Sequence, residues 1–301
     1  MKKIIVFVLP IFLWISPLYA QLRVVTTSTD LASIVKEVGG DLVQVESLAE
    51  GNMDLHFVPA QPDFISKVNK ADVFIEVGLD LEIGWTPRVL HMARNTKVMP
   101  GQKGYCNTSK GVKVIMPQVK EVNRSMGDVH AKGNPHYWID PVNGVVIARN
   151  IKDTLVRVDP ANKAVYDQNL RRFAKDIKDF MAKAELQMKA SNGQSLVVYH
   201  KEFAYLFRRF GIQTAMSIEE KPGVPPGPAR VRQVVDYIKK NSIPAVVVAP
   251  WSNTGLARKI AKDANVKLII MPIQTGSKPN TESYLKMLKQ SVNLLSGAFP
   301  G

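Results

Sequence analysis

The feature that most constrains this chain is an alternation of strands and helices that occurs twice along it. Residues 22–28 (LRVVTTS) are apolar and β-branched, residues 30–40 (DLASIVKEVGG) carry apolar side chains at helical spacing, and residues 41–50 (DLVQVESLAE) alternate. A helix at 62–71 and a buried strand at 72–78 follow. Such an alternation is typical of a parallel sheet covered by helices. These residues therefore predict an α/β domain.

The same alternation returns after Gly193, where three apolar strands are each followed by a helix. We therefore expect two doubly wound α/β domains. The predicted elements of the second domain are the strands 195–200, 244–250 and 267–272 and the helices 201–211, 229–243, 255–266 and 281–299.

Between the two alternations lies the least interrupted helical segment of the chain, from about Asn162 to Lys189. An ordinary packing helix shows the same apolar spacing. At about 1.5 Å per residue, however, this helix would reach on the order of 40 Å and could join the two domains. We expect an N-terminal domain at 21–160, a rigid linker helix at 161–190 and a C-terminal domain at 191–301.

Residues 1–20 are expected to be a signal peptide that is removed from the folded protein. Lys2 and Lys3 precede an apolar run that ends at Leu18-Tyr19-Ala20, which indicates cleavage after Ala20. An uncleaved anchor is the alternative, but the run is shorter than the roughly 20 residues that span a bilayer. No Cys begins the mature chain, so a lipid anchor is not expected there.

The formal net charge of +14 makes nucleic acid the first partner to consider. The Lys and Arg residues, however, are scattered among Asp and Glu at helical positions, as in residues 170–189, with no aromatic platform beside them. We expect no nucleic-acid partner, and a solvated surface or weak attraction to anionic lipid accounts for the charge. Cys106 is the only cysteine, so no intramolecular disulfide forms, and a buried, inert thiol is expected.

Three of the five histidines share one sequence context. His56 (NMDLHFVP) follows a strand and precedes a helix, His136 (NPHYWIDP) lies between a loop and a helix, and His200 (SLVVYHKEF) ends an apolar strand. In doubly wound sheets the carboxyl ends of strands face the ligand crevice. Each histidine alone would more often serve local structure, but their matching contexts favour a shared metal site. Three imidazoles suit zinc and leave a fourth position open.

The other two histidines are not expected to be main ligands. His91 lies on a helical face, where a structural or exposed role is expected. His130 lies in the polar loop 114–133 (VIMPQVKEVNRSMGDVHAKG) and is expected to be solvated, with transient metal contacts as the alternative.

The chain resembles the zinc- and manganese-binding solute-binding proteins of ABC importers, the cluster A-I type, from about Val24 to the final helix. The order of several motifs carries this resemblance, since each motif alone is weak. The motifs are residues 52–82 (NMDLHFVPAQPDFISKVNKADVFIEVGLDLE), 134–141 (NPHYWIDP), 159–173 (DPANKAVYDQNLRRF), 199–211 (YHKEFAYLFRRFG) and 282–288 (ESYLKML).

The resemblance implies a periplasmic metal-binding protein, not an enzyme, that delivers a divalent metal ion to a membrane permease of an ABC transporter. It places the metal ligands at His56, His136 and His200, in a cleft between the domains, and implies that the long helix is rigid. A monomer is expected. Asp140, by contrast, is expected to cap the next helix, with Pro141 at the first helical position.

The sequence departs from the family pattern in the last loop, residues 269–280 (IIMPIQTGSKPN), where relatives commonly place an acidic fourth ligand. Water is the simplest substitute, and Glu82, Glu202 and Gln274 are alternatives. Exposed or helix-surface roles are expected for the two glutamates.

Two further departures lie in the second domain. Ala249 stands where relatives usually carry a glutamate after a strand. Residues 219–230 (EEKPGVPPGPAR) are rich in proline and glycine, and are expected to form either a lid over the cleft or a plain surface connection.

Zinc is favoured over manganese because manganese prefers more oxygen ligands, although copper or nickel also suits three imidazoles. A zinc-dependent hydrolase is an alternative function, since three His ligands and an open position also describe catalytic zinc, with Glu202 as the candidate base. A third possible function is that of a surface adhesin that keeps the fold around a vestigial metal site.

Overall fold

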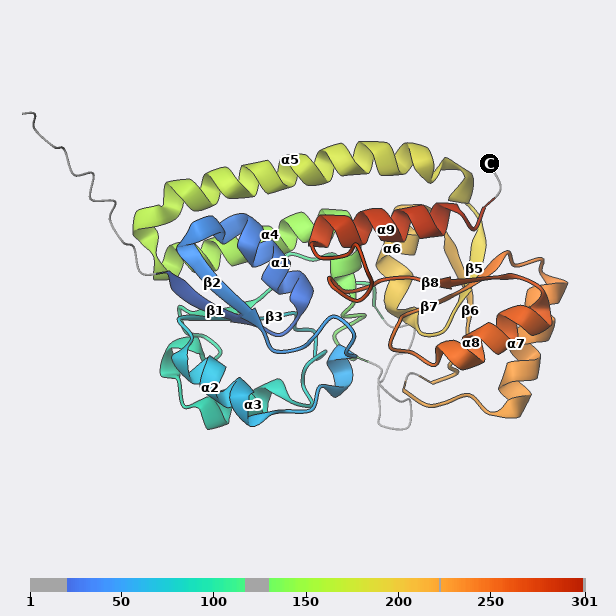
Figure 1. Ribbon diagram of the computed structural model, residues 1–301, viewed down its shortest axis with the longest axis horizontal. Coiled ribbons are helices and arrows are strands. Elements are labelled where there is room, and N and C mark those ends of the chain that lie inside the picture. The colour runs from blue at the N-terminus through green and yellow to red at the C-terminus, as the bar shows by residue number, and fades with distance from the viewer. Residues whose placement is uncertain (1–20, 117–129, 222, 300–301) are drawn as a thin grey trace, which may run out of the picture.

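The computed structural model describes residues 21–116, 130–221 and 223–299 (Figure 1). The expected signal peptide at 1–20 and most of the polar loop around residues 117–129 lie outside the described residues. Two sheets lie next to each other, and one long helix runs along both of them.

The first domain is built on a parallel sheet of four strands in the order β2-β1-β3-β4. Val24, near the middle of β1, pairs with Val45 of β2 and Val73 of β3. Val24 and Val25 of β1 and the apolar residues of β3 are buried because helices cover both faces of such a sheet. The strands are β1 (Leu22–Thr26), β2 (Val43–Ser47), β3 (Val73–Glu76) and β4 (Tyr105–Asn107), and the helices are α1 (Thr29–Gly39), α2 (Pro62–Lys70), α3 (Thr86–Ala93) and α4 (Pro141–Val158).

The second domain repeats this topology with the strand order β6-β5-β7-β8, again parallel. The doubly wound α/β architecture predicted from the sequence is therefore confirmed for both halves. Its strands are β5 (Ser195–Val198), β6 (Gln213–Ser217), β7 (Ala245–Val248) and β8 (Lys267–Ile270), and its helices are α6 (Ala204–Arg209), α7 (Pro228–Lys240), α8 (Thr254–Ala264) and α9 (Tyr284–Ser296).

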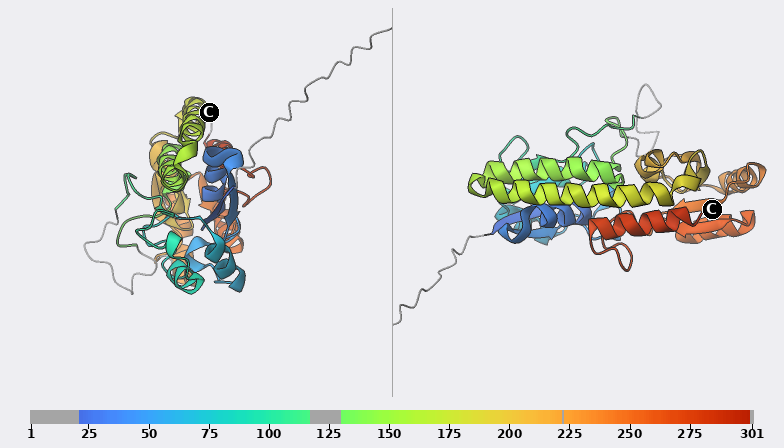
Figure 2. Two further views of the ribbon diagram at one scale, coloured as in Figure 1. Left: turned by 90° about the vertical axis from the view of Figure 1, so that its left-hand side faces the viewer. Right: turned by 90° about the horizontal axis from the view of Figure 1, so that it is seen from above.

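Helix α5 (Lys163–Gln187) is the predicted linker helix, and it falls within residues 161–190. It packs on α4 and α1 over the first domain and on α9 over the second, which Figure 2 shows from above. The exact domain bounds stay a prediction. Among the described residues, no helix combines the length and apolarity that a membrane crossing needs.

One apolar core runs through both domains, from Val24 in β1 to Leu295 in α9, and a second, smaller core lies within the second domain around Val246 of β7. Helix α9 also contacts α1 of the first domain. The Tyr284 backbone N–H donates to Ser33 Oγ of α1 at 2.9 Å, and the Tyr284 hydroxyl donates to the backbone oxygen of Trp138. These buried contacts hold the two domains in one arrangement around the loops that lie between them.

The loop after β8 is held by the start of α1. Thr275 donates from its backbone N–H and its hydroxyl to Asp30 Oδ1, at 2.9 and 2.8 Å. The Thr29 hydroxyl donates back to the Thr275 carbonyl at 2.7 Å. Gly51 allows the two loops to approach closely, because a Cβ there would collide with the same carbonyl. The loop that leads to His56 is thus fixed against the second domain.

Candidate metal centre

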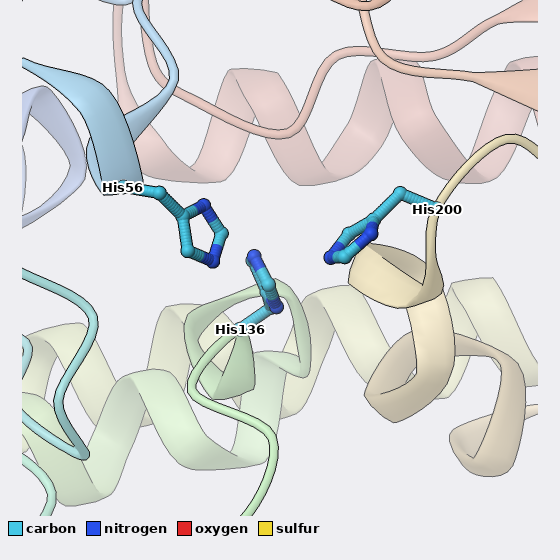
Figure 3. A group of neighbouring side chains, drawn as sticks. All are labelled: His56, His136 and His200. Carbon is cyan, nitrogen blue, oxygen red and sulfur yellow. The ribbon is translucent and has the colours of Figure 1, made fainter. Parts of the chain in front are cut away.

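Three imidazoles from both domains meet in one place (Figure 3). One ring nitrogen of His56, one of His136 and one of His200 all lie within 4.8 Å of one another. The ring centroids are 5.1 Å apart for His56 and His136, 5.5 Å for His136 and His200, and 5.9 Å for His56 and His200. The structure therefore brings together the three residues that the sequence predicted as ligands.

Each histidine is positioned by a short 3-10 turn. His56 lies inside the turn Leu55–Phe57, whereas His136 and His200 directly precede the turns Tyr137–Ile139 and Lys201–Phe203. His200 lies two residues beyond the end of β5, at the switch point where β5 is flanked by β6 and β7. This is where doubly wound folds bind their ligands.

The Nδ1 atom of every one of these imidazoles has an oxygen partner. His56 Nδ1 lies 2.6 Å from Asp54 Oδ1, His136 Nδ1 lies 3.0 Å from Asn134 Oδ1, and His200 Nδ1 lies 3.1 Å from Glu219 Oε2. A ring whose Nδ1–H donates to such an oxygen keeps the lone pair of Nε2 free for a metal ion. The arrangement orients three metal-binding nitrogens toward one point.

Burial and neighbouring groups shift the pKa values of the site in opposite directions. His136 is only 4% exposed, and burial together with the neighbouring imidazoles holds its pKa well below the usual value. Burial alone would lower the pKa of His200 and raise that of Asp54. The hydrogen bond to Glu219 and the nearby carboxylate charges together outweigh burial and raise the pKa of His200. The hydrogen bonds from His56 and the charges of the nearby imidazoles together outweigh burial and lower the pKa of Asp54.

A cavity of about 50 Å³ adjoins the three imidazoles, which is room for a cation and a few water molecules. Besides the histidines, the cavity is lined by three carboxylates, one hydroxyl and two aromatic side chains. These are Asp54, Glu202, Glu219, Ser252, Phe57 and Trp251.

Glu202 lines this cavity, and the surface role expected for it is wrong. It is 2% exposed, and neither carboxylate oxygen has a hydrogen-bond partner among the described residues. Burial raises the pKa of its carboxyl to about 7. The sequence suggested a helix surface because Glu202 precedes a helix, but that helix begins inside the molecule.

Glu82 is also buried rather than exposed, so the surface role expected for it is wrong as well. Its carboxylate accepts hydrogen bonds from the Thr27 hydroxyl and from the backbone N–H groups of Val77 and Gly78, at 2.6, 2.8 and 3.0 Å. Burial and the nearby Glu76 raise its pKa to about 7. Because its oxygens are already occupied in the loop after β3, Glu82 has a structural role.

Gln274 and the proline-rich segment take different positions relative to the cavity. The Gln274 amide donates to the Met53 carbonyl at 2.9 Å, so it braces the loop before His56 and does not line the cavity. In the segment 219–230, Glu219 and Gly223 line the cavity, and Glu219 Oε2 accepts from the Gly223 backbone N–H at 3.3 Å. The segment therefore reaches the site, as a lid would.

His130 does not match the solvated role expected for it. Its Nε2 lies 3.1 Å from His56 Nε2, and its side chain is partly buried. Burial, followed by the charge of His56, lowers the pKa of His130 to about 4. His91, in contrast, is exposed on α3. Cys106 is buried as expected, and burial raises its pKa to about 11.

Asp140 caps α4 as predicted, accepting a hydrogen bond from the Val142 backbone N–H at 3.0 Å with Pro141 at the first helical position. Asp140 has a second structural role that the sequence did not reveal. Arg209 of α6 donates to both Asp140 carboxylate oxygens, at 3.0 and 2.8 Å, and so ties the second domain to the start of α4.

Sequence reasoning also missed the three partners of the imidazoles. Asp54 and Asn134 each stand two residues before a ligand, in the patterns DLH and NPH, and each also accepts a bond from the backbone N–H of its histidine. That repeated spacing is a usable signal. Glu219 lies 19 residues after His200 and gives no such signal.

Comparisons with known proteins agree with this fold. Residues 24–298 match the family model of the periplasmic zinc-uptake complex component A, ZnuA. The manganese ABC transporter substrate-binding lipoprotein PsaA of Streptococcus pneumoniae is 26% identical over 282 residues, which cover 92% of this chain and 88% of that protein. The zinc-binding lipoprotein AdcA of Streptococcus pneumoniae (strain ATCC BAA-255 / R6) is 23% identical over 283 residues, which cover 91% of this chain and 55% of that one.

A crystal structure of ZnuA has the same fold, with a TM-score of 0.78 at 20% identity, and the match covers 92% of this chain and 99% of that one.

Proposed function

Because this chain belongs to the ZnuA family, the periplasmic component A of zinc-uptake complexes, we propose that it binds one zinc ion through His56, His136 and His200. The observation that carries the proposal is the convergence of three imidazole nitrogens within 4.8 Å of one another, each on a ring whose Nδ1 is held by an oxygen. Three neutral imidazoles and one further ligand make a tetrahedral site of the kind zinc prefers.

The protein is a metal-binding substrate-binding protein of an ABC transporter and not an enzyme. Zinc and manganese are both carried by relatives, as the names of AdcA and PsaA state. The three imidazoles support zinc over manganese in this proposal, since imidazole nitrogen suits zinc and manganese favours more oxygen ligands.

In this role the ion is held in the cleft between the two α/β domains and presented to a membrane permease. The mature chain acts in the periplasm as a monomer. Burial of the imidazoles serves this task because few water molecules compete for the ion, and because empty, converging imidazoles favour its capture. The hydrolase alternative is not retained, because the family consists of metal-binding components of uptake systems rather than enzymes.

The test is metal stoichiometry and affinity on the purified mature protein. We expect one zinc ion per chain, and we expect each of His56→Ala, His136→Ala and His200→Ala to weaken binding by more than the roughly 10- to 100-fold loss that removal of an outer-shell partner causes. His91→Ala is the matched control, because that imidazole is exposed on α3. Equal zinc binding by all four variants would refute the site.

Competition between ions tests the choice of zinc. Titration of the metal-free protein with zinc in the presence of excess manganese is expected to reach full zinc occupancy at one equivalent. Retention of manganese under those conditions would assign the protein to manganese instead.

A further inference from the structure

Glu202 is a buried carboxylate that the three-histidine site leaves unexplained. It lies in the turn Lys201–Phe203, two residues after His200, and lines the same cavity as the three imidazoles. It is 2% exposed, and neither Oε1 nor Oε2 has a hydrogen-bond partner among the described residues. Buried polar groups in folded proteins are almost always paired, so an unpaired carboxylate points to a missing partner.

The charges around Glu202 identify what kind of partner is missing. The charges that act most strongly on its carboxylate are those of His200, Glu219 and Asp54, two of which are acidic. Among the described residues, no Lys or Arg lines the cavity that these groups share. A hydrogen-bonding partner alone would leave three carboxylates gathered around the imidazoles. A divalent cation would balance this excess of negative charge.

We propose that Glu202 supplies the fourth ligand of the bound metal ion, through a carboxylate oxygen on the side of the three imidazoles that faces the cavity. This inference rests on the proposed function and names a further residue of the same site. Glu202 stands outside the group of nitrogen atoms that lie within 4.8 Å of one another, so it reaches the ion by rotation about its own side-chain bonds. Because neither of its oxygens is hydrogen-bonded to another described residue, that rotation breaks no contact of this kind.

The arrangement also explains how an acidic ligand can be present although the last loop, residues 269–280, contains no Asp or Glu. The carboxylate comes from the turn beside His200 instead, while Gln274 of the last loop is bonded to the Met53 carbonyl. One carboxylate oxygen adds negative charge and a hard donor to three imidazoles. It therefore strengthens binding of every divalent ion and favours manganese more than an all-imidazole site would.

The experiment compares Glu202→Gln with Glu185→Gln, which makes the same change on an exposed position of α5. For Glu202→Gln we expect zinc affinity to fall at least tenfold and manganese affinity to fall further, so the zinc-to-manganese preference rises. The visible absorption bands of the cobalt-loaded protein should also change, since they report the ligands of the ion directly. The Glu185→Gln protein should match the wild type in all three measurements.

A structural role for Glu202 gives a different result. Removal of a buried, unpaired charge should leave the metal-free Gln variant as stable as the wild type or more stable, while the rise in melting temperature on zinc binding becomes smaller. A metal-free variant that is less stable, with unchanged cobalt bands and zinc affinity, would overturn the inference. Glu202→Asp keeps the charge on a shorter side chain, and its zinc affinity should be lower than that of the wild type. This comparison tests the inference even if the Gln variant folds poorly.

Failure of this inference is distinguishable from failure of the proposed function. If the wild type binds zinc and His136→Ala abolishes binding, but Glu202→Gln binds as the wild type does, only the fourth ligand is wrong. If wild type and His136→Ala bind zinc equally, the three-histidine site itself is wrong and the role of Glu202 falls with it.

Discussion

His56 Nδ1 lies 2.6 Å from Asp54 Oδ1, and this contact joins a candidate metal ligand to a carboxylate two residues before it. Asp54 also accepts from the His56 backbone N–H at 3.0 Å, so one side chain fixes both the backbone turn and the ring. Asn134 holds His136 in the same way, but with an uncharged amide. The acidic partner makes the His56 imidazole the more electron-rich donor.

Replacement of Asp54 by Asn tests that contribution. The amide oxygen of Asn can still accept both bonds, so the turn should persist, but the negative charge behind His56 is lost. We expect zinc affinity to fall about 10- to 100-fold, which is the usual effect of an outer-shell change. Competition with a chromophoric chelator measures it. Asp176→Asn on the exposed side of α5 is the control, and equal affinities of the two variants would contradict the expectation.

His130 is hydrogen-bonded to Nε2 of His56, the nitrogen through which His56 would bind a metal ion. Because His56 Nδ1 donates to Asp54, its Nε2 accepts, and His130 Nε2–H is the donor across 3.1 Å. An incoming ion must break this bond. His130→Ala should therefore bind zinc about 2- to 10-fold faster, from a hydrogen bond of about 0.5–1.5 kcal/mol.

Stopped-flow mixing of the metal-free protein with zinc gives the rate, and His91→Ala serves as the exposed control. A lower zinc affinity without faster binding would show that His130 joins the ion rather than blocks it.

The sequence predicted the helices and most strands because their apolar residues follow clear periods, as in β7, where four consecutive residues are buried. It did not reveal β6, whose residues Gln213–Ser217 are exposed or half-buried at the edge of the sheet. Nor did it reveal β4, which is three residues long. Short and edge strands carry too few buried side chains to produce a pattern.

The candidate site was predictable in part for the same reason. The ends of buried strands can be read from the sequence, so His200 could be placed at a crevice. Glu202 could not, because its burial depends on α6 lying between the second sheet and the first domain, where Tyr205 donates to the Asn134 carbonyl. Glu219 could not be placed either, because it follows β6 and that strand was not predicted. Contacts between distant segments determine the surroundings of both glutamates, and such contacts cannot be derived from the local sequence pattern.

Asp30 gives the stability of the protein a specific pH dependence. Burial raises the pKa of its carboxyl from 3.8 to about 7, although Thr275 donates to it twice. As the pH rises above 4, the unfolded chain loses this proton before the folded chain does, so the free energy of unfolding falls. The loss continues until Asp30 ionises in the folded state near pH 7.

Asp30→Asn removes the titration while its amide oxygen can still accept from Thr275. Between pH 5 and pH 8 we expect the wild type to lose about 2 kcal/mol of stability relative to this variant. Urea unfolding of both metal-free proteins at the two pH values measures the difference, in which the titration of other groups cancels. A difference that stays constant with pH would mean that Asp30 is ionised throughout.

Gly144 allows α4 to pack against the hydroxyl end of Tyr284 in α9. A Cβ built on Gly144 would lie 2.6 Å from both Cε1 and the hydroxyl oxygen of that ring. Tyr284 is fully buried and donates to the Trp138 carbonyl, so the ring has little freedom to move. Alanine favours a helix by about 1 kcal/mol over glycine, whereas overpacking of a core costs about 1–3 kcal/mol.

The cost of overpacking should exceed the gain in helix preference, so Gly144→Ala should lower the free energy of unfolding by about 1 kcal/mol. Urea unfolding measures this change. Gly255→Ala in the first turn of α8 is the matched control. There the nearest atom to the new Cβ is Asn253 Oδ1 at 3.5 Å, an ordinary contact, so the helix preference acts alone and stability should rise. Equal stabilisation by the two substitutions would mean that α9 can shift away from α4, and that the interdomain packing is looser than the buried Tyr284 indicates.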